Sequence, residues 1–316
     1  MKAIRLHGRG GPDHLFYENV PQPHPSPGEV LVRVSATGIL VHELRWNETY
    51  ETKAGSKRVL PIPGRDLSGV VVEVGPGVTA LSEGAEVYAM LDYGRDGAEA
   101  DYTIALPGEL APKPRTLDSV QAAAVPLPAL TAWQGLFEHA SLVAGQTVLI
   151  HGGAGGVGVF AVQLAQLTGA HVIATASARN RDFLRDLGAD ECIDYTTTRF
   201  EDVVHEVDFV FDLVGGDTLH RSWQVIKPGG MLVSTVSPPP PADVVKGHDV
   251  RFVWFVVEPN RNELVQIGSL IDAGKLRPII DAVFPFPRRA RPMNREPKGT
   301  RGARLSCAWW IKAPRS

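Results

Sequence analysis

Cysteine is scarce in this chain of 316 residues, which holds only Cys192 and Cys307. Two cysteines cannot build a disulfide scaffold or a four-cysteine zinc site. No apolar run approaches the roughly 18–20 residues that a membrane-spanning helix needs. The opening residues, MKAIRLHGRGG, reach glycine and charge too early for a secretory signal. These absences predict a cytoplasmic protein with no membrane partner.

Net charge is also small, at −3, with 44% hydrophobic and 21% charged residues. This balance is ordinary for a globular protein and disfavours nucleic acid as a partner. The length suits two domains, or one large domain, with an ample core. The charge is uneven, however, because residues 287–316 hold nine lysines or arginines and a single acid, Glu296. This basic tail carries +8 and leaves −11 for the rest of the chain.

Residues 1–120 and 145–275 differ in texture. The first part is rich in glycine and proline and has short alternations such as EVLVRVSATGI, typical of antiparallel strands in a barrel-like β domain. The second part alternates strand and helix patterns, which predicts a parallel sheet with crossover helices. We expect a helix over 259–273 to cover that sheet. The expected strands are 147–151, 171–176, 192–195, 207–213, 231–236 and 250–257, and the crossover helices 157–168, 179–187 and 217–225.

One stretch of the second part, HGGAGGVG, places Gly153, Gly155 and Gly158 in the pattern G-x-G-x-x-G. A lone match is weak, but this one follows an expected strand and opens an expected helix. The glycines allow a tight turn, a close approach to a diphosphate and packing of the helix on the strand. With Gly156 and Val157, they predict a dinucleotide site at the helix N-terminus. The alternative is a glycine-rich turn without a ligand.

The residues after the next expected strand indicate which dinucleotide binds. NAD sites place an acid about 20 positions beyond the glycines, where it holds the ribose hydroxyls. Here the strand ends at Ser177, and the first acid, Asp182, is expected inside the following helix. Arg179 and Arg181 lie nearby, and their charge suits the 2′-phosphate of NADP. The sequence therefore favours NADP over NAD, unless both arginines are only solvated surface charges.

The stretches PIPGRDLSGVVVEVGPGV, AAAVPLPALTAW, HGGAGGVG and LGADECIDY together carry a family resemblance. Over about residues 1–286 the chain resembles the medium-chain dehydrogenase/reductase superfamily, and within it the zinc-free quinone oxidoreductase (zeta-crystallin-like) branch. This implies an α/β fold with a GroES-like β-barrel substrate domain over 1–122 and a doubly wound, parallel-sheet Rossmann domain over 123–275. Residues 276–316 would return to the first domain. The cofactor would lie between the domains.

The resemblance also implies residues that border NADP. Thr131 matches a threonine near the nicotinamide. Tyr195 matches a tyrosine that lies with Ser177 and Arg181 near the adenosine phosphate. The loops in DLVGG and STV end parallel strands, where ligands of such sheets bind even without the resemblance, although each has the alternative of an ordinary buried loop. These loops add Val214, Gly215, Ser234 and Thr235.

Zinc-dependent members of the superfamily use a cysteine, a Gly-His-Glu histidine and a further ligand. In this chain the counterpart of the cysteine lies near Leu40, and Arg65 replaces the histidine. A catalytic zinc needs three N, S or O ligands, so we expect no metal. Without a Lewis acid, alcohol oxidation loses its alkoxide stabilisation, whereas quinones and conjugated carbonyl compounds still accept hydride.

We therefore predict an NADPH-dependent oxidoreductase that reduces quinones or α,β-unsaturated carbonyl compounds. Tyr50, in a loop with Trp46, is a candidate catalytic proton donor to this small-molecule substrate, and the alternative is a plain aromatic wall. Asp66 is expected to hold a structural network. A non-catalytic NADPH-binding protein, with RNA as a partner in zeta-crystallin-like relatives, and a zinc alcohol dehydrogenase are the rival interpretations. The resemblance also allows a homodimer.

The end of the chain departs from the family. Family members end with a short helix and a final strand of the β domain. DAVFPF at 281–286 fits, but the basic tail has neither a helical nor a strand pattern. We expect the last strand to be missing and an edge of the β domain to be exposed. A reading-frame change near Pro287 would explain the tail; the alternative is a genuine basic tail that binds an anionic partner.

Overall fold

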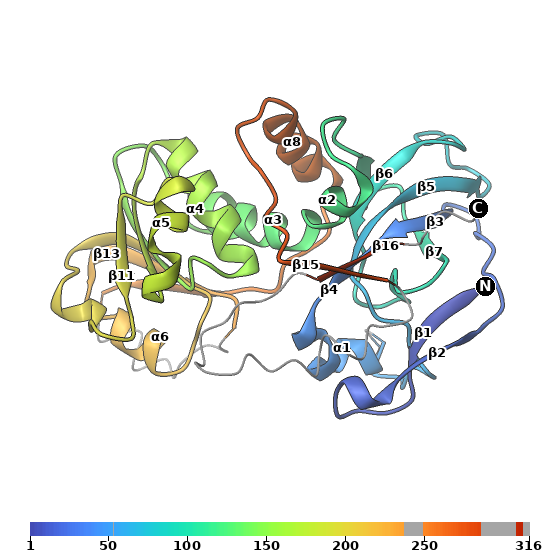
Figure 1. The fold of residues 1–316 in the computed structure, drawn as a ribbon, viewed down its shortest axis with the longest axis horizontal. Helices are drawn as coiled ribbons and strands as arrows, with labels where there is room; N and C mark the ends of the chain where they lie inside the picture. The colour runs from blue at the N-terminus through green and yellow to red at the C-terminus, as the bar shows by residue number, and fades with distance from the viewer. Residues whose placement is uncertain (53, 237–248, 286–307, 312–316) are drawn as a thin grey trace. The chain divides into compact units, whose positions relative to one another are not determined.

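The structure of the chain, a computed structural model, describes residues 1–52, 54–236, 249–285 and 308–311. These residues form two compact units (Figure 1). Unit 1 holds Met1–Leu127 together with 258–285 and 308–311, and unit 2 holds Pro128–Val257. In these ranges, no helix has the length and apolar character needed to cross a bilayer.

Unit 2 is built on a six-stranded parallel sheet of order β11-β10-β9-β12-β13-β14. The chain starts in the middle at β9, adds two strands on one side and then three on the other, so the predicted doubly wound parallel sheet is confirmed. The strands are β9 (Thr147–His151), β10 (His171–Ala176), β11 (Glu191–Asp194), β12 (Val207–Asp212), β13 (Ile226–Ser234) and β14 (Arg251–Trp254).

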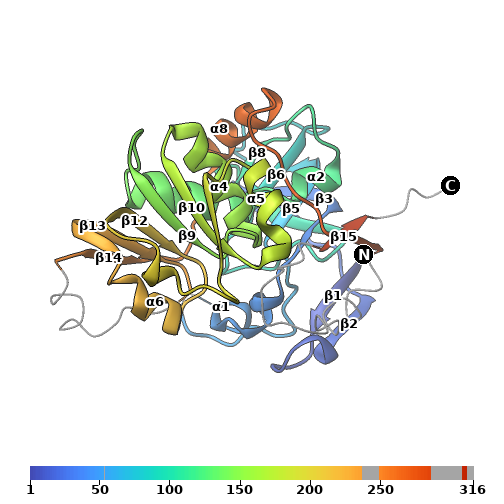
Figure 2. The same ribbon diagram turned by 60° about the vertical axis from the view of Figure 1, so that its left-hand side comes forward.

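The helices of unit 2 follow the predicted crossovers. Those between strands are α4 (Gly156–Thr168), a short 3-10 turn η4 (Ala178–Asn180) that leads into α5 (Arg181–Asp186), the turn η5 (Phe200–Asp202) and α6 (Asp217–Ser222). Before the sheet, α3 (Pro126–Trp133) continues directly into a π-helical segment, η3 (Gln134–His139). Figure 2 shows α4 and α5 beside β9 and β10.

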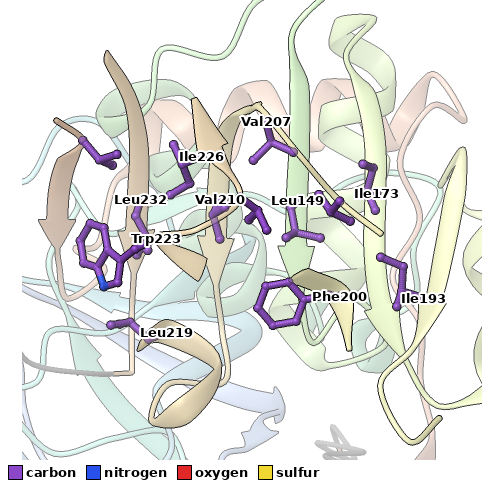
Figure 3. Close-up of a cluster of buried hydrophobic side chains, with 13 residues drawn as sticks. Leu149, Ile173, Ile193, Phe200, Val207, Val210, Leu219, Trp223, Ile226 and Leu232 are labelled. Atoms are coloured by element: carbon purple, nitrogen blue, oxygen red, sulfur yellow. The ribbon is translucent and has the colours of Figure 1, made fainter. Parts of the chain in front are cut away.

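One core cluster of unit 2 lies between the sheet and α6 (Figure 3). Leu149, Val210 and Leu232 come from three neighbouring strands, and Leu219 and Trp223 come from α6 and its end. Full burial of one such aliphatic side chain is worth about 1.5–3 kcal/mol. The alternation of these residues along each strand sets the register, and the register aligns the strand ends that carry the candidate site.

Unit 1 contains the predicted antiparallel β domain. Its main sheet has the order β7-β3-β5-β6-β8, and a separate pair, β1 with β2, lies outside it. Alternate residues of β3 (Val30, Val32 and Val34) are buried in the main core. The strands are β1 (Lys2–Leu6), β2 (Leu15–Asn19), β3 (Val30–Ala36), β5 (Asp66–Val74), β6 (Glu86–Met90), β7 (Tyr102–Ala105) and β8 (Leu110–Pro112).

The helical segments of unit 1 are short, apart from α8 (Arg261–Asp272). The expectation that this helix covers the parallel sheet was wrong, because it belongs to unit 1, where the hydroxyl of Tyr88 on β6 donates to the Leu264 carbonyl. An apolar stripe identifies a buried helix face but not the sheet that the face covers. The other segments are η1 (Pro12–His14), η2 (Val41–Arg45), α1 (Asn47–Tyr50) and α2 (Ser119–Ala123).

The end of the chain corrects another expectation. β15 (Ala282–Pro285) lies within the predicted 281–286 segment. β16 (Ala308–Ile311) pairs with β15 and with β4 (Gly38–Ile39), so the expectation of no final strand was wrong for 308–311. The apolar, aromatic run AWWI suits a strand even at four residues. The reading-frame hypothesis concerns positions mostly outside the described residues and stays a prediction.

Candidate functional site

The glycine-rich turn joins the end of β9 to the start of α4. Gly155 is the N-cap of this 13-residue helix, and no side chain caps it. N–H groups in the first helical turn have no acceptor within the helix, so they are available to an anion. A Cβ on Gly158 would lie 2.3 Å from the Gly152 carbonyl oxygen, and one on Gly153 would lie 2.9 Å from the Cβ of Ala174. The turn therefore needs glycine at both positions, and it fits a dinucleotide diphosphate.

The carboxyl ends of four parallel strands meet beside this turn. The register aligns His151 of β9 with Thr175 of β10 and Asp212 of β12, and it aligns Asp212 with Ser234 of β13. The glycine turn, the loop with Val214 and Gly215, and the pair Ser234 and Thr235 all follow these strand ends. The structure thus brings most of the predicted cofactor residues to one edge of the sheet, where open α/β sheets bind ligands.

Asp212 organises the loop after β12. Its carboxylate accepts the N–H groups of Val214 at 3.1 Å and Gly215 at 2.9 Å, and it accepts the Ser234 hydroxyl at 2.9 Å. Burial raises the pKa of Asp212, and these hydrogen bonds oppose the rise. Sequence reasoning selected the three partners but missed the carboxylate that holds them. The available signal was an acid at the end of a strand, two residues before Val214.

The predicted adenosine end lies beyond β10 and β11. Ser177 and Tyr195 follow these strands directly, and Arg179 and Arg181 lie in η4 and at the start of α5. Both arginines are exposed, and neither forms an ion pair with any residue that the structure describes. Tyr195 is 43% exposed. Two unpaired guanidinium groups at this edge fit a phosphate monoester, which they can bind bidentately.

Thr131 lies apart from these strand ends in the sequence, on α3. Its side chain is buried and takes part in an interaction. Its place near the nicotinamide stays a prediction from the family resemblance.

In unit 1, Arg65 stands where the resemblance places the zinc-binding histidine, and it forms a buried ion pair with Glu43. Arg65 Nε lies 3.1 Å from Glu43 Oε1, and the two side chains are 1% and 0% exposed. Both Glu43 oxygens accept the Gly64 N–H, and Arg65 Nη1 donates to the carbonyls of Asp92 and Arg95. A guanidinium stays protonated in proteins and offers no lone pair to a metal.

A catalytic zinc does not fit this arrangement. The carboxylate of Glu43 is already committed to Arg65 and Gly64. In the part of the chain that the structure describes, no group of three or more His, Cys, Asp or Glu side chains could hold a metal ion. The aligned residues thus supply neither the number nor the type of ligand that a zinc site requires.

Asp66, next to Arg65, has the structural role that we expected. Its carboxylate accepts the N–H of Leu127 at 2.6 Å, which ties β5 to α3. Burial raises the pKa of Asp66 to about 8, with the Leu127 hydrogen bond opposing the rise and the nearby Glu43 adding to it. A carboxyl held in this way serves the fold, because its oxygen is occupied by backbone.

Tyr50 ends α1 and is only 8% exposed. Its hydroxyl donates to the Leu44 carbonyl at 2.9 Å, and the Arg9 guanidinium lies 4.6 Å from the centre of its ring. Arg9 also donates to Asn47 and Glu51, so it fastens both sides of this short helix. Burial raises the pKa of Tyr50. The proton is engaged within the loop, which favours the aromatic wall over the proton donor.

Comparison with known families agrees with this architecture. The family model described as an alcohol dehydrogenase GroES-like domain matches residues 26–115, and the family model described as a zinc-binding dehydrogenase matches residues 187–293. A probable zinc-binding oxidoreductase, mitochondrial, of Arthroderma benhamiae is 37% identical over 84% of each chain. An NADPH-dependent alkenal/one oxidoreductase, chloroplastic, of Arabidopsis thaliana is 36% identical over 91% of this chain and 73% of that protein.

Solved structures show the same likeness. The quinone oxidoreductase from Coxiella burnetii superposes with a TM-score of 0.85 and 32% identity, over 93% of this chain and 94% of that one. The chain therefore belongs to the medium-chain dehydrogenase/reductase superfamily, in its quinone oxidoreductase-like branch. The expected two-domain α/β fold of that family is confirmed.

Proposed function

We propose that this chain is an NADPH-dependent oxidoreductase that reduces α,β-unsaturated carbonyl compounds or quinones without a metal. The observation that carries the proposal is the uncapped N-terminus of α4 behind a glycine turn, with two unpaired arginines beyond the next strand. The relatives named as an NADPH-dependent alkenal/one oxidoreductase and a quinone oxidoreductase support the cofactor and both substrate classes.

In this proposal, different residues of unit 2 bind different parts of the cofactor. The N–H groups at the start of α4 bind the diphosphate, and Ser177, Arg179, Arg181 and Tyr195 surround the 2′-phosphate. The loop that Asp212 shapes borders the nicotinamide end together with Thr131. When bound, NADPH supplies the hydride, and the protein supplies binding and orientation. The full set is Thr131, Gly153, Gly155, Gly156, Val157, Gly158, Ser177, Arg179, Arg181, Tyr195, Val214, Gly215, Ser234 and Thr235.

The substrate class follows from the absence of suitable zinc ligands around Arg65. An enone or a quinone accepts hydride at carbon, and the resulting oxyanion needs only hydrogen bonds and a proton, for which water suffices. An alcohol would need a Lewis acid to stabilise its alkoxide. The buried Glu43–Arg65 pair supports the former chemistry, although the relative from Arthroderma benhamiae carries zinc in its name.

Location and assembly belong to the proposal as well. We keep a cytoplasmic location as a prediction; the similar proteins from Arthroderma benhamiae and Arabidopsis thaliana are named as mitochondrial and chloroplastic. A homodimer also stays a prediction, and size-exclusion chromatography with light scattering would test it.

The central experiment is oxidation of NADPH and NADH by the purified chain with 1,4-benzoquinone, 9,10-phenanthrenequinone and a simple enone. We expect NADPH to give at least about tenfold higher kcat/KM than NADH, which is about 1.4 kcal/mol of discrimination. Replacing Arg179 and Arg181 together with serine should bring the ratio close to unity. Arg185→Ser, a change of the same kind on α5, is the matched control and should leave the ratio unchanged.

Three outcomes would contradict parts of the proposal. Unchanged NADPH fluorescence at millimolar cofactor would show that the glycine turn binds no dinucleotide. Binding without turnover across the substrate panel would favour the non-catalytic NADPH-binding protein. Stoichiometric zinc after dialysis would overturn the metal-free chemistry.

A further inference from the structure

A chain of buried hydrogen bonds lies behind the glycine turn and links β10, β9 and α6. His151, the last residue of β9, is fully buried. Its Nδ1 lies 3.2 Å from Thr175 Oγ1, and its Nε2 lies 3.0 Å from Ser222 Oγ. Thr175 also accepts two hydrogen bonds from the start of the glycine turn. Its Oγ1 accepts the Gly152 N–H at 3.3 Å, and its carbonyl accepts the Gly153 N–H at 3.1 Å.

Counting protons assigns the donors in this chain. The Ser222 hydroxyl donates its only proton to the Thr218 carbonyl at 2.7 Å, so His151 Nε2 must be the donor to Ser222. A neutral imidazole then has a lone pair at Nδ1, which accepts the Thr175 hydroxyl proton. Thr175 Oγ1 keeps a lone pair for the Gly152 N–H. Every donor thus meets an acceptor only when the ring is neutral and its proton is on Nε2.

The surroundings of His151 keep the ring neutral. The Phe200 ring packs edge-on against it, with the ring centroids 4.5 Å apart. Burial lowers the pKa of His151 to about 3, the positive charge of Arg221 lowers it as well, and Glu201 acts in the opposite sense. Arg221 is itself held by Glu201 and by Asp217 of α6. Burial and the charge of Arg221 thus favour the neutral ring, in agreement with the hydrogen-bond assignment.

We propose that His151 and Thr175 form a positioning pair that sets the direction of the Gly152 and Gly153 N–H groups and thereby shapes the turn for the cofactor diphosphate. The turn cannot hold its own shape through side chains, since Gly153 and Gly158 leave no room for a Cβ. Residues outside the turn therefore have to orient it, and Thr175 accepts hydrogen bonds from the N–H groups of both Gly152 and Gly153. This inference rests on the proposed function, because it takes the turn to bind NADPH.

The two ends of the imidazole can be mimicked separately. Asparagine places its amide near the Nδ1 position and can still accept the Thr175 hydroxyl, whereas glutamine reaches toward Ser222 and gives up Thr175. We expect His151→Asn to bind NADPH within about threefold of wild type and His151→Gln to bind about tenfold more weakly. Thr175→Val should weaken binding about as much as His151→Gln, and Thr175→Ser, which keeps the hydroxyl, should restore it.

The measurements are a fluorescence titration of NADPH, KM and kcat for the enone, and thermal denaturation of each variant. We expect the dissociation constant of NADPH to change while kcat at saturating NADPH stays within about twofold. Thr168→Val is the matched control: it removes a hydroxyl that donates to the Leu164 carbonyl at the far end of α4. It should leave NADPH affinity unchanged.

A merely structural role for His151 makes a different prediction. The asparagine and glutamine variants would then lose affinity only in proportion to their loss of stability. Equal NADPH affinities for the two variants at equal stability would overturn the positioning role, and so would wild-type affinity in Thr175→Val. NADPH binding by the wild-type chain would still uphold the proposed function in either case. If wild type itself bound no NADPH, both proposals would be wrong.

Discussion

Each unit buries a cluster of polar groups at a position that matters for the family's chemistry, and the two clusters differ in charge. In unit 1, Glu43 and Arg65 form an ion pair that backbone groups surround. In unit 2, His151 is a neutral link between two hydroxyl groups. The charged cluster makes its hydrogen bonds within unit 1, although Arg65 Nη2 is buried without a hydrogen-bond partner among the described residues. The neutral cluster makes hydrogen bonds to a turn that consists mostly of glycine.

This difference in charge suggests that the cluster of unit 1 stabilises the fold, whereas the cluster of unit 2 supports a ligand site. A buried ion pair adds little net stability, because desolvation offsets the attraction, but breaking it is costly. Such a pair fixes a loop and leaves little freedom for chemistry. A neutral chain costs less to bury, and it can hold backbone N–H groups in one direction without adding a charge beside an anionic ligand. The ligand is therefore expected where the buried groups are neutral.

The largest expected effect comes from breaking the charged cluster. Glu43→Gln leaves the Arg65 guanidinium buried without its counter-charge, and we expect the free energy of unfolding to fall by about 3–5 kcal/mol. Urea denaturation measures the change. The control is Glu86→Gln, whose Lys113 partner is 3.8 Å away and whose side chain is 64% exposed, with an expected loss under about 1 kcal/mol. Similar losses for both variants would show that the buried pair is not special.

Lowering the pH should reduce the free energy of unfolding through His151, which belongs to the neutral cluster. The unfolded chain protonates His151 near its ordinary pKa of 6.5, whereas the folded chain does so only near pH 3. The contribution of His151 to stability is therefore fully present above pH 6.5 and is lost as pH falls toward 3. Between about pH 7 and about pH 4.5 we expect a loss on the order of 2–3 kcal/mol from this residue.

Other groups also titrate in that range, so the comparison must be made with a variant. His151→Asn has no ionisable ring, and its unfolding free energy should fall less steeply over the same range than that of wild type. Urea denaturation at several pH values measures both slopes. Parallel slopes would mean that His151 takes up its proton over the same pH range in the folded and unfolded chains, which would contradict a pKa lowered by burial.

The local parts of this fold could be predicted from the sequence. Apart from β13, which begins five residues before its expected start, the strands of the parallel sheet and the helix after the glycines lie within about three residues of their expected ranges. Alternation and helical periodicity are local signals. The long-range partners could not be predicted. His151 lies 24 positions from Thr175 and 71 from Ser222, and no local pattern connects them. The strand at 308–311 was missed for the same reason, because its partners lie far away in the chain.

In the candidate site as well, the residues selected from the sequence are those with a local signal, and the long-range partners were missed. The glycine spacing and the arginines after β10 could be identified because the motif fixes their offsets. The role of Asp212 depends on a strand neighbour, Ser234, 22 positions away, which sequence spacing does not reveal. Tyr50 shows the converse: its position in a loop suggested an available hydroxyl, and only the structure shows that this hydroxyl donates a hydrogen bond to the Leu44 carbonyl.

The smallest expected effect concerns that hydroxyl. Tyr50→Phe removes one neutral hydrogen bond and keeps the ring that Arg9 covers, so we expect the free energy of unfolding to fall by about 1 kcal/mol. The kcat for enone reduction should stay within about twofold, because the proton is already engaged in the loop. Tyr88→Phe is the matched control, since Tyr88 is another buried tyrosine that donates to a backbone carbonyl. A fall in kcat of about 100-fold for Tyr50→Phe alone would instead identify Tyr50 as the general acid, and the loop would then have to release its hydroxyl during turnover.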